Sequence, residues 1–142
     1  MLASQPQVAA QLAAAYDEAW KAVDPVLLEL VRLRIAMLLG CAAELAERTP
    51  AAVGAGLDEA MVSDLASWST SPRFGARERA CLAYVEQWLI DVASMTDADA
   101  AAVCDVLGGD GLAAFSAALL VIEQRQRLRL AWQQIFGEEH ST

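Results

Sequence analysis

Five side chains in the first third of the chain have the types and the spacing that chemistry requires. Glu29 lies in a densely apolar stretch that is typical of a helix, with Arg32 one turn further on. Cys41 follows, and Glu44 and Arg48 come three and seven residues after it, which returns them to roughly the same face of a helix. We therefore expect a thiol, carboxylates and a guanidinium to meet on one side of a broken helix pair.

Thiol chemistry is the first possibility for this group. A dithiol reductase needs two thiols that can form a disulfide, and one of them must ionise to attack. The three cysteines, Cys41, Cys81 and Cys104, lie far apart in the sequence and form neither a Cys-x-x-Cys pair nor a zinc-binding spacing. Cys81 and Cys104 lie in apolar helical patterns, so we expect them in the core. Cys41 alone leaves a one-cysteine peroxidase as one enzyme alternative.

Carboxylate chemistry is the second possibility, and a structural ion-pair network is the third. Glu29 or Glu44 could act as the base of a non-redox lyase or isomerase. In the structural interpretation Arg48 lies between Glu29 and Glu44, because one arginine compensates carboxylates that are costly to bury. If the same residues line a pocket instead, Arg48 would bind a small anionic ligand, with help from Arg125 or Arg127.

The last apolar helix carries further candidates. Arg125, Arg127 and Arg129 alternate beside Glu123, and a spacing of two spreads them around a helix, so we expect salt bridges at the surface or at an interface. Glu29, Glu44 and Glu123 together could hold a hard cation, but the sequence has no spacing of ligands that is typical of a metal site. We therefore expect no metal and no cofactor. The binding candidates are Glu44, Arg48, Glu123, Arg125 and Arg127.

Composition bounds the class of protein. The chain has 142 residues, the length of one domain. Hydrophobic residues make up 56% of it and the mean hydropathy is +0.33; because a domain this small has limited interior, we expect a subunit interface and a homo-oligomer. The net charge of −9 argues against nucleic acid. The longest apolar run, 112–122, is too short to cross a bilayer and no signal peptide is recognisable, so we expect no membrane contact and a cytoplasmic location.

Helical periodicity runs through the chain and no strand pattern appears, which predicts an all-α fold. Gly40 is expected to kink a helix and Pro50 to disturb the next one. Asp58, Thr96 and Asp110 are the expected caps. The expected helices span 7–22, 26–39, 41–48, 57–68, 75–93, the segment from Thr96 to Gly108, and 111–136. A polar tail, 137–142, carries the only histidine, His140, which we expect to be solvated.

The residues around Cys41 resemble a known family. Glu29-Leu30-Val31-x-Leu33, followed by Gly40-Cys41, is similar to the alkyl hydroperoxidase D-like group of the carboxymuconolactone decarboxylase superfamily. Its members show Glu-Leu-Val-x-Leu-x-Val and then Asn-Gly-Cys-x-x-Cys-x-x-x-His. Further pieces in register are Gly56-Leu57-Asp58, Trp68 to Phe74, Glu78-Arg79-Ala80 and 122–128. The resemblance implies one helical domain of this type over residues 1–142, with about six or seven helices, assembled as a trimer or hexamer, with a dimer as the alternative.

Three positions of the family motif differ here. Glu44 stands at the second cysteine, Arg48 at the histidine and Leu39 at the asparagine. The family uses the histidine and the upstream carboxylate as a proton relay, but an arginine stays protonated and cannot shuttle protons. The resemblance therefore implies a ligand-binding, assembly or accessory module that has lost the redox dithiol. Glu29 and Cys41 would be catalytic only in the enzyme alternatives.

Overall fold

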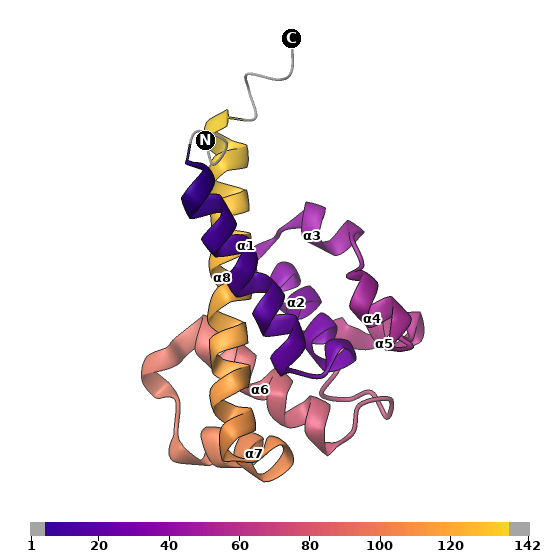
Figure 1. Cartoon of the computed structure of the whole chain (residues 1–142). Coiled ribbons are helices and arrows are strands. Elements are labelled where there is room, and N and C mark those ends of the chain that lie inside the picture. Colours follow the sequence, from indigo (N-terminus) through magenta and orange to yellow (C-terminus); the bar gives the residue numbers. More distant parts are fainter. Residues whose placement is uncertain (1–4, 137–142) are drawn as a thin grey trace.

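Helices joined by short turns make up the part of the chain that the computed structural model describes, residues 5–136 (Figure 1). No strand occurs within these residues, which confirms the all-α prediction. The predicted polar tail, with His140, lies outside the described residues. The elements are α1 (Pro6–Ala22), α2 (Pro25–Leu39), α3 (Ala42–Ala46), α4 (Pro50–Gly54), α5 (Glu59–Asp64), η2 (Leu65–Ser67), α6 (Ala76–Asp91), η3 (Val92–Ser94), α7 (Asp97–Leu107) and α8 (Gly109–Phe136).

Helix α2 is the central helix and packs against α3, α4, α6 and α8. Asp24 caps its first turn, because the carboxylate accepts a hydrogen bond from the N–H of Leu27 at 2.9 Å. Nine of its fifteen residues are buried, including two charged ones. Gly40 ends the helix with φ +74°, a left-handed conformation that suits glycine, so residue 40 terminates the helix where a kink was predicted. Helix α2 therefore carries charged side chains into the interior.

Two clusters of buried apolar side chains hold the helices together. The larger lies among α1, α2, α6, α7 and α8, where the rings of Phe115 and Tyr84 have centroids 5.9 Å apart. Cys81 belongs to this cluster, as predicted, whereas Cys104 on α7 is only half-buried. The smaller cluster, between α2, η2 and α6, consists of Leu30, Leu33, Leu65, Phe74 and Leu82.

The predictions at two helix starts are wrong, and both concern residues that suit a first turn. Pro50 begins α4 instead of only disturbing a helix, because a first-turn residue does not need the N–H that proline lacks. The last helix begins at Gly109, so Asp110 lies inside its first turn and is not the cap. The caps predicted at Asp58 and Thr96 are confirmed.

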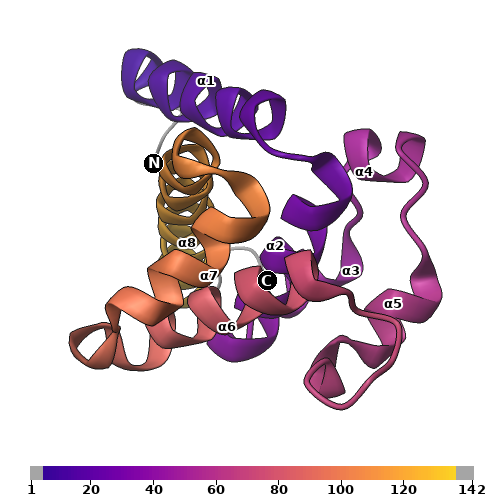
Figure 2. The same ribbon diagram turned by 90° about the horizontal axis from the view of Figure 1, so that it is seen from below.

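Helices α1 and α8 lie side by side along one side of the molecule, away from α4 and α5 (Figures 1 and 2). Helix α8 is 28 residues long, and its C-terminal part extends past the core helices next to α1 (Figure 1). Between residues 5 and 136, no single helix is long and apolar enough to cross a membrane. Helices α7 and α8, which meet at 111°, reach that length and composition only when they are taken together.

Candidate functional site

A buried ion-pair network joins α2 to α3. Arg32, only 2% exposed, donates from Nε to Glu29 Oε1 at 3.0 Å and from Nη1 to Glu44 Oε2 at 2.7 Å. Its Nη2 also donates to Glu29. The backbone carbonyls of Glu44 and Glu47 accept from the same guanidinium at 2.8 and 2.9 Å. All five N–H donors of the arginine are thereby satisfied, as a buried guanidinium requires.

A second arginine, from α8, adds another positive charge to the network. Arg129 Nη1 lies 3.0 Å from Glu44 Oε1, and its Nη2 lies 2.7 Å from Glu47 Oε1. Glu44, on α3, therefore accepts from one arginine on α2 and from another on α8. Because the buried carboxylates of Glu29 and Glu44 each face a guanidinium, the cost of burying them is compensated. The network fixes the positions of three helices relative to one another.

Charge pairing also sets the protonation of these arginines. Burial disfavours the charged form of Arg32, but the hydrogen bonds and negative charges of Glu29 and Glu44 outweigh it and raise its pKa above the usual value for arginine. The hydrogen bond from Arg129 lowers the pKa of Glu47, against a smaller opposing effect of burial. Neither guanidinium can therefore act as a general acid or base at neutral pH.

Arg48 lies outside this network, so the prediction that it pairs with the two buried carboxylates is wrong. Its Nε donates to Glu59 Oε1 at 2.9 Å, and its Nη1 donates to two backbone carbonyls. The prediction assumed one helix from Cys41 to Arg48, whereas α3 ends at Ala46 and Glu47 is extended. Because of this break, Arg48 points toward α5, and Arg32 lies between the carboxylates of Glu29 and Glu44 instead.

Cys41 immediately precedes α3 and has no exposed surface. Its backbone N–H donates to Ala36 O at 2.9 Å, which closes the turn after α2. Cys41, Cys81 and Cys104 are all free thiols. The side chain three residues after Cys41 is the carboxylate of Glu44, which is already paired with two arginines. The candidate site therefore combines one buried thiol, just before α3, with the buried ion pairs that join α2, α3 and α8.

The remaining predicted binding residues lie on α8, at two separate places. Glu123 accepts from Trp88 Nε1 at 2.8 Å and from Arg127 Nε at 2.9 Å. Arg125 instead lies over the ring of Tyr16, with its guanidinium carbon 4.1 Å from the ring centre. In the described part of the chain, none of these residues hydrogen-bonds to Glu29 or Arg32, and no group of His, Cys, Asp and Glu side chains is arranged to hold a metal ion.

Sequence reasoning missed the roles of Arg32, Arg129 and Gln126. The spacing of three residues between Glu29 and Arg32 was a usable signal for the first. Gln126 donates from Nε2 to the backbone carbonyl of Arg32 at 3.0 Å, across 94 residues of sequence, and Arg129 reaches Glu44 across 85. No local pattern could have indicated these two contacts. Among the described residues, the buried side-chain nitrogen and oxygen atoms without a hydrogen-bond partner are Glu29 Oε2, Gln126 Oε1 and Trp20 Nε1.

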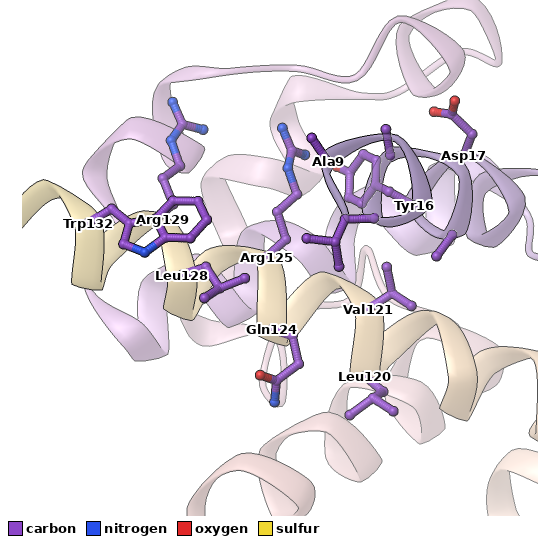
Figure 3. Close-up of a pocket in the computed structure, with 13 residues that line it drawn as sticks. Ala9, Tyr16, Asp17, Leu120, Val121, Gln124, Arg125, Leu128, Arg129 and Trp132 are labelled. Carbon is purple, nitrogen blue, oxygen red and sulfur yellow. The ribbon is translucent and has the colours of Figure 1, made fainter. Parts of the chain in front are cut away.

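A groove of about 580 Å³ lies between α1 and α8 (Figure 3). Its walls are mostly apolar, and the guanidinium groups of Arg125 and Arg129 reach it from α8. The amphipathic spacing of α1 was the sequence signal for an exposed apolar face, but the partner helix could not be inferred from it. The lining residues include Leu12, Tyr16, Asp17, Arg125, Leu128 and Trp132.

Comparison with family models identifies the chain. A model of the carboxymuconolactone decarboxylase family matches residues 6–87, more than half of the sequence. The chain belongs to the carboxymuconolactone decarboxylase family. The matched segment runs from α1 into α6 and includes Cys41 and the residues that surround it. No protein of curated function matched the chain.

A solved structure supports the fold of this carboxymuconolactone decarboxylase family member. The chain is similar to a crystal structure of a protein of unknown function from Agrobacterium tumefaciens, which is described as a suggested antioxidant defence protein AhpD. The identity is 18% over 90% of this chain and 89% of that one, and the TM-score is 0.80. This likeness establishes the alkyl hydroperoxidase D-like fold, whereas any chemistry has to be argued from the site itself.

The three thiols of this family member should differ in reactivity. Burial raises the pKa of Cys81 to about 12, Cys41 has no exposed surface, and Cys104 is half-buried. Because the thiolate is the reactive form, we expect iodoacetamide at pH 8 to alkylate native protein first at Cys104, with the other two at least about ten-fold slower. Peptide mass spectrometry of timed samples measures each site. Protein unfolded in urea is the control, and rapid native labelling of Cys41 would contradict its burial.

Proposed function

We propose that this family member is a non-redox binding and assembly module and not a thiol peroxidase. The observation that carries the proposal is the commitment of Glu44, three residues after Cys41, to buried ion pairs with Arg32 and Arg129. A dithiol cycle needs a second thiol within bonding reach of the first. In this chain a carboxylate occupies that place, and its pairing with two arginines gives it a structural role.

The charged groups near Cys41 in the sequence that could be considered for proton transfer are also held in ion pairs. Arg48 stands at the position of the family's histidine and pairs with Glu59, and an arginine cannot serve as a proton shuttle. Glu29 and Glu44 are fully buried and bonded to arginines, so a substrate would have to break an ion pair to use either as a base. These contacts favour the module over both enzyme alternatives, the one-cysteine peroxidase and the lyase or isomerase.

A peroxide-consumption assay tests the proposal. The wild type and Cys41→Ser are compared side by side, with hydrogen peroxide or an organic hydroperoxide and a disulfide reductant present. We expect neither protein to consume peroxide faster than the reductant alone. Cys104→Ser is the matched control, because it removes the most accessible of the three thiols. Catalytic turnover by the wild type and by Cys104→Ser that disappears in Cys41→Ser would refute the proposal.

We further propose that the module self-associates, in the cytoplasm. The mean hydropathy of the chain is +0.33, and apolar side chains are exposed on α1 and α8. A single small domain cannot bury so much apolar surface by itself. Light scattering coupled to size-exclusion chromatography measures the assembly, and we expect more than one chain per particle. A monomer at all concentrations would remove assembly from the proposed function and leave the absence of peroxidase chemistry untouched.

A further inference from the structure

The outer surface of α1 and α8 has exposed apolar side chains that no other element of the described residues covers. Val8 and Leu12 on α1 are 46% and 42% exposed, and Leu120 on α8 is 48% exposed. Helix α1 has 17 residues, of which only Ala19 is buried. The groove of about 580 Å³ opens along this surface. Apolar side chains clustered around a groove are typical of a surface that binds a partner.

Two charged residues of the groove have no partner of opposite sign among the described residues. Asp17 on α1 and Arg125 on α8 both line the groove, and neither has an oppositely charged group within 4.0 Å in the described part of the chain. Figure 3 shows both side chains pointing to the same side of the groove, at different positions along it, with Arg125 beside the ring of Tyr16. A partner for this surface should therefore be apolar and should offer one carboxylate and one guanidinium.

We propose that the partner is a second copy of the chain, which packs its α1 and α8 against those of the first about a two-fold axis. In such an interface residue i contacts residue j of the partner, and j contacts i in return. Asp17 of each copy then pairs with Arg125 of the other, and the apolar residues around Leu12 of both copies are buried together. This inference rests on the self-association proposed above and assigns it a surface and a pair of contacts.

The net charge of the chain explains why the pairing of Asp17 with Arg125 would be important for assembly. Each copy carries a net charge of −9, so two copies repel one another at long range. Complementary pairs at the interface offset that repulsion and fix the relative orientation of the two copies. Arg129, the other arginine of the groove, is already paired with Glu44 and Glu47, which leaves Arg125 as the cation available to a partner.

The apolar part of the interface is tested by sedimentation velocity over a range of protein concentrations. Leu12→Asp should raise the dissociation constant of the assembly at least about ten-fold, because it places a carboxylate in a desolvated surface. Ile90→Asp is the matched control, since Ile90 is 70% exposed on α6, away from the groove, and should leave the assembly unchanged. A wild-type monomer, or an assembly that Leu12→Asp leaves intact, would overturn the proposal.

The charged contact is tested by exchanging the two charges. Asp17→Arg and Arg125→Asp should each weaken the assembly at least about ten-fold, because each places like charges opposite one another. The double variant should assemble again to within about three-fold of the wild type, and an equimolar mixture of the two single variants should form mixed pairs. Circular dichroism of every variant shows whether it is folded, so a loss of assembly is not mistaken for unfolding.

Three results would decide against the pairing. Failure of both the double variant and the mixture to assemble would exclude the contact between Asp17 and Arg125. A wild type that sediments only as a trimer would exclude the two-fold arrangement. Single variants that assemble as well as the wild type would exclude any role for the two charges. None of these results depends on peroxide turnover, so the proposed absence of peroxidase chemistry is tested separately. A wild type that assembles while the variants behave otherwise than expected would exclude this interface and leave the self-association standing.

Discussion

Replacing Arg32 with methionine should lower the free energy of unfolding by about 3–5 kcal/mol, because it leaves buried carboxylates without their counter-charge. Methionine retains most of the apolar volume of the side chain, so the loss reports charge and hydrogen bonding more than packing. Glu29 would keep no cation in the described part of the chain, and Glu44 would keep only Arg129. Urea unfolding followed by circular dichroism measures the change, at one fixed protein concentration because the proposed assembly would contribute to stability.

Two comparisons make this result specific to the network. Arg48→Met should cost at most about 1 kcal/mol, since Arg48 is only half-buried and its partner Glu59 is 63% exposed to solvent. Replacing both carboxylates as well, in the triple variant Glu29→Leu, Arg32→Met and Glu44→Leu, should recover most of the loss, because no unpaired charge then remains buried. Equal losses for Arg32→Met and Arg48→Met would show that the interior pairing is not the source of the stability.

Replacing Phe115 with alanine should lower the free energy of unfolding by about 3–5 kcal/mol, through lost burial and the cavity that remains. Phe115 is fully buried in the larger core cluster and packs against Tyr84. The ring lies where α6, α7 and α8 meet, so the cavity would be shared by elements that are already closely packed and cannot easily collapse into it.

The control for this second prediction is Ile90→Ala. Ile90 is exposed on α6, so its truncation should change the free energy of unfolding by no more than about 0.5 kcal/mol. Unfolding in urea under identical conditions compares the two variants. A small loss for Phe115→Ala would mean that the cluster repacks around the missing ring, and a binding assay with a small apolar probe would distinguish a dry cavity from a collapsed one.

The helices were predictable because their ends carry strong local signals. Asp58 and Thr96 cap the helices that follow them, and Gly40 adopts the left-handed conformation that ends α2. The prediction failed where one residue type has two roles. A proline both breaks a helix interior and begins a first turn, so Pro50 was read as a disturbance when it starts α4.

The site was only partly predictable, because its geometry depends on where α3 stops. Spacing alone placed Arg48 on the same helical face as Cys41, and that inference fails once Glu47 becomes extended. The pairing of Glu29 with Arg32 was predictable from the sequence, since residues three apart on a helix are neighbours. The contacts of Glu44 with Arg129 and of Arg32 with Gln126 span most of the chain, and only the packed fold brings them together.

The reach of α8 back to α2 and α3 has a consequence for synthesis on the ribosome. Arg129 is made 85 residues after Glu44, and Gln126 is made 94 residues after Arg32. A nascent chain that has folded as far as α6 would hold this carboxylate without its second arginine, and the groove side of α1 would have no neighbour. We expect the nascent domain to stay loosely packed until α8 leaves the exit tunnel, and then to close in one step.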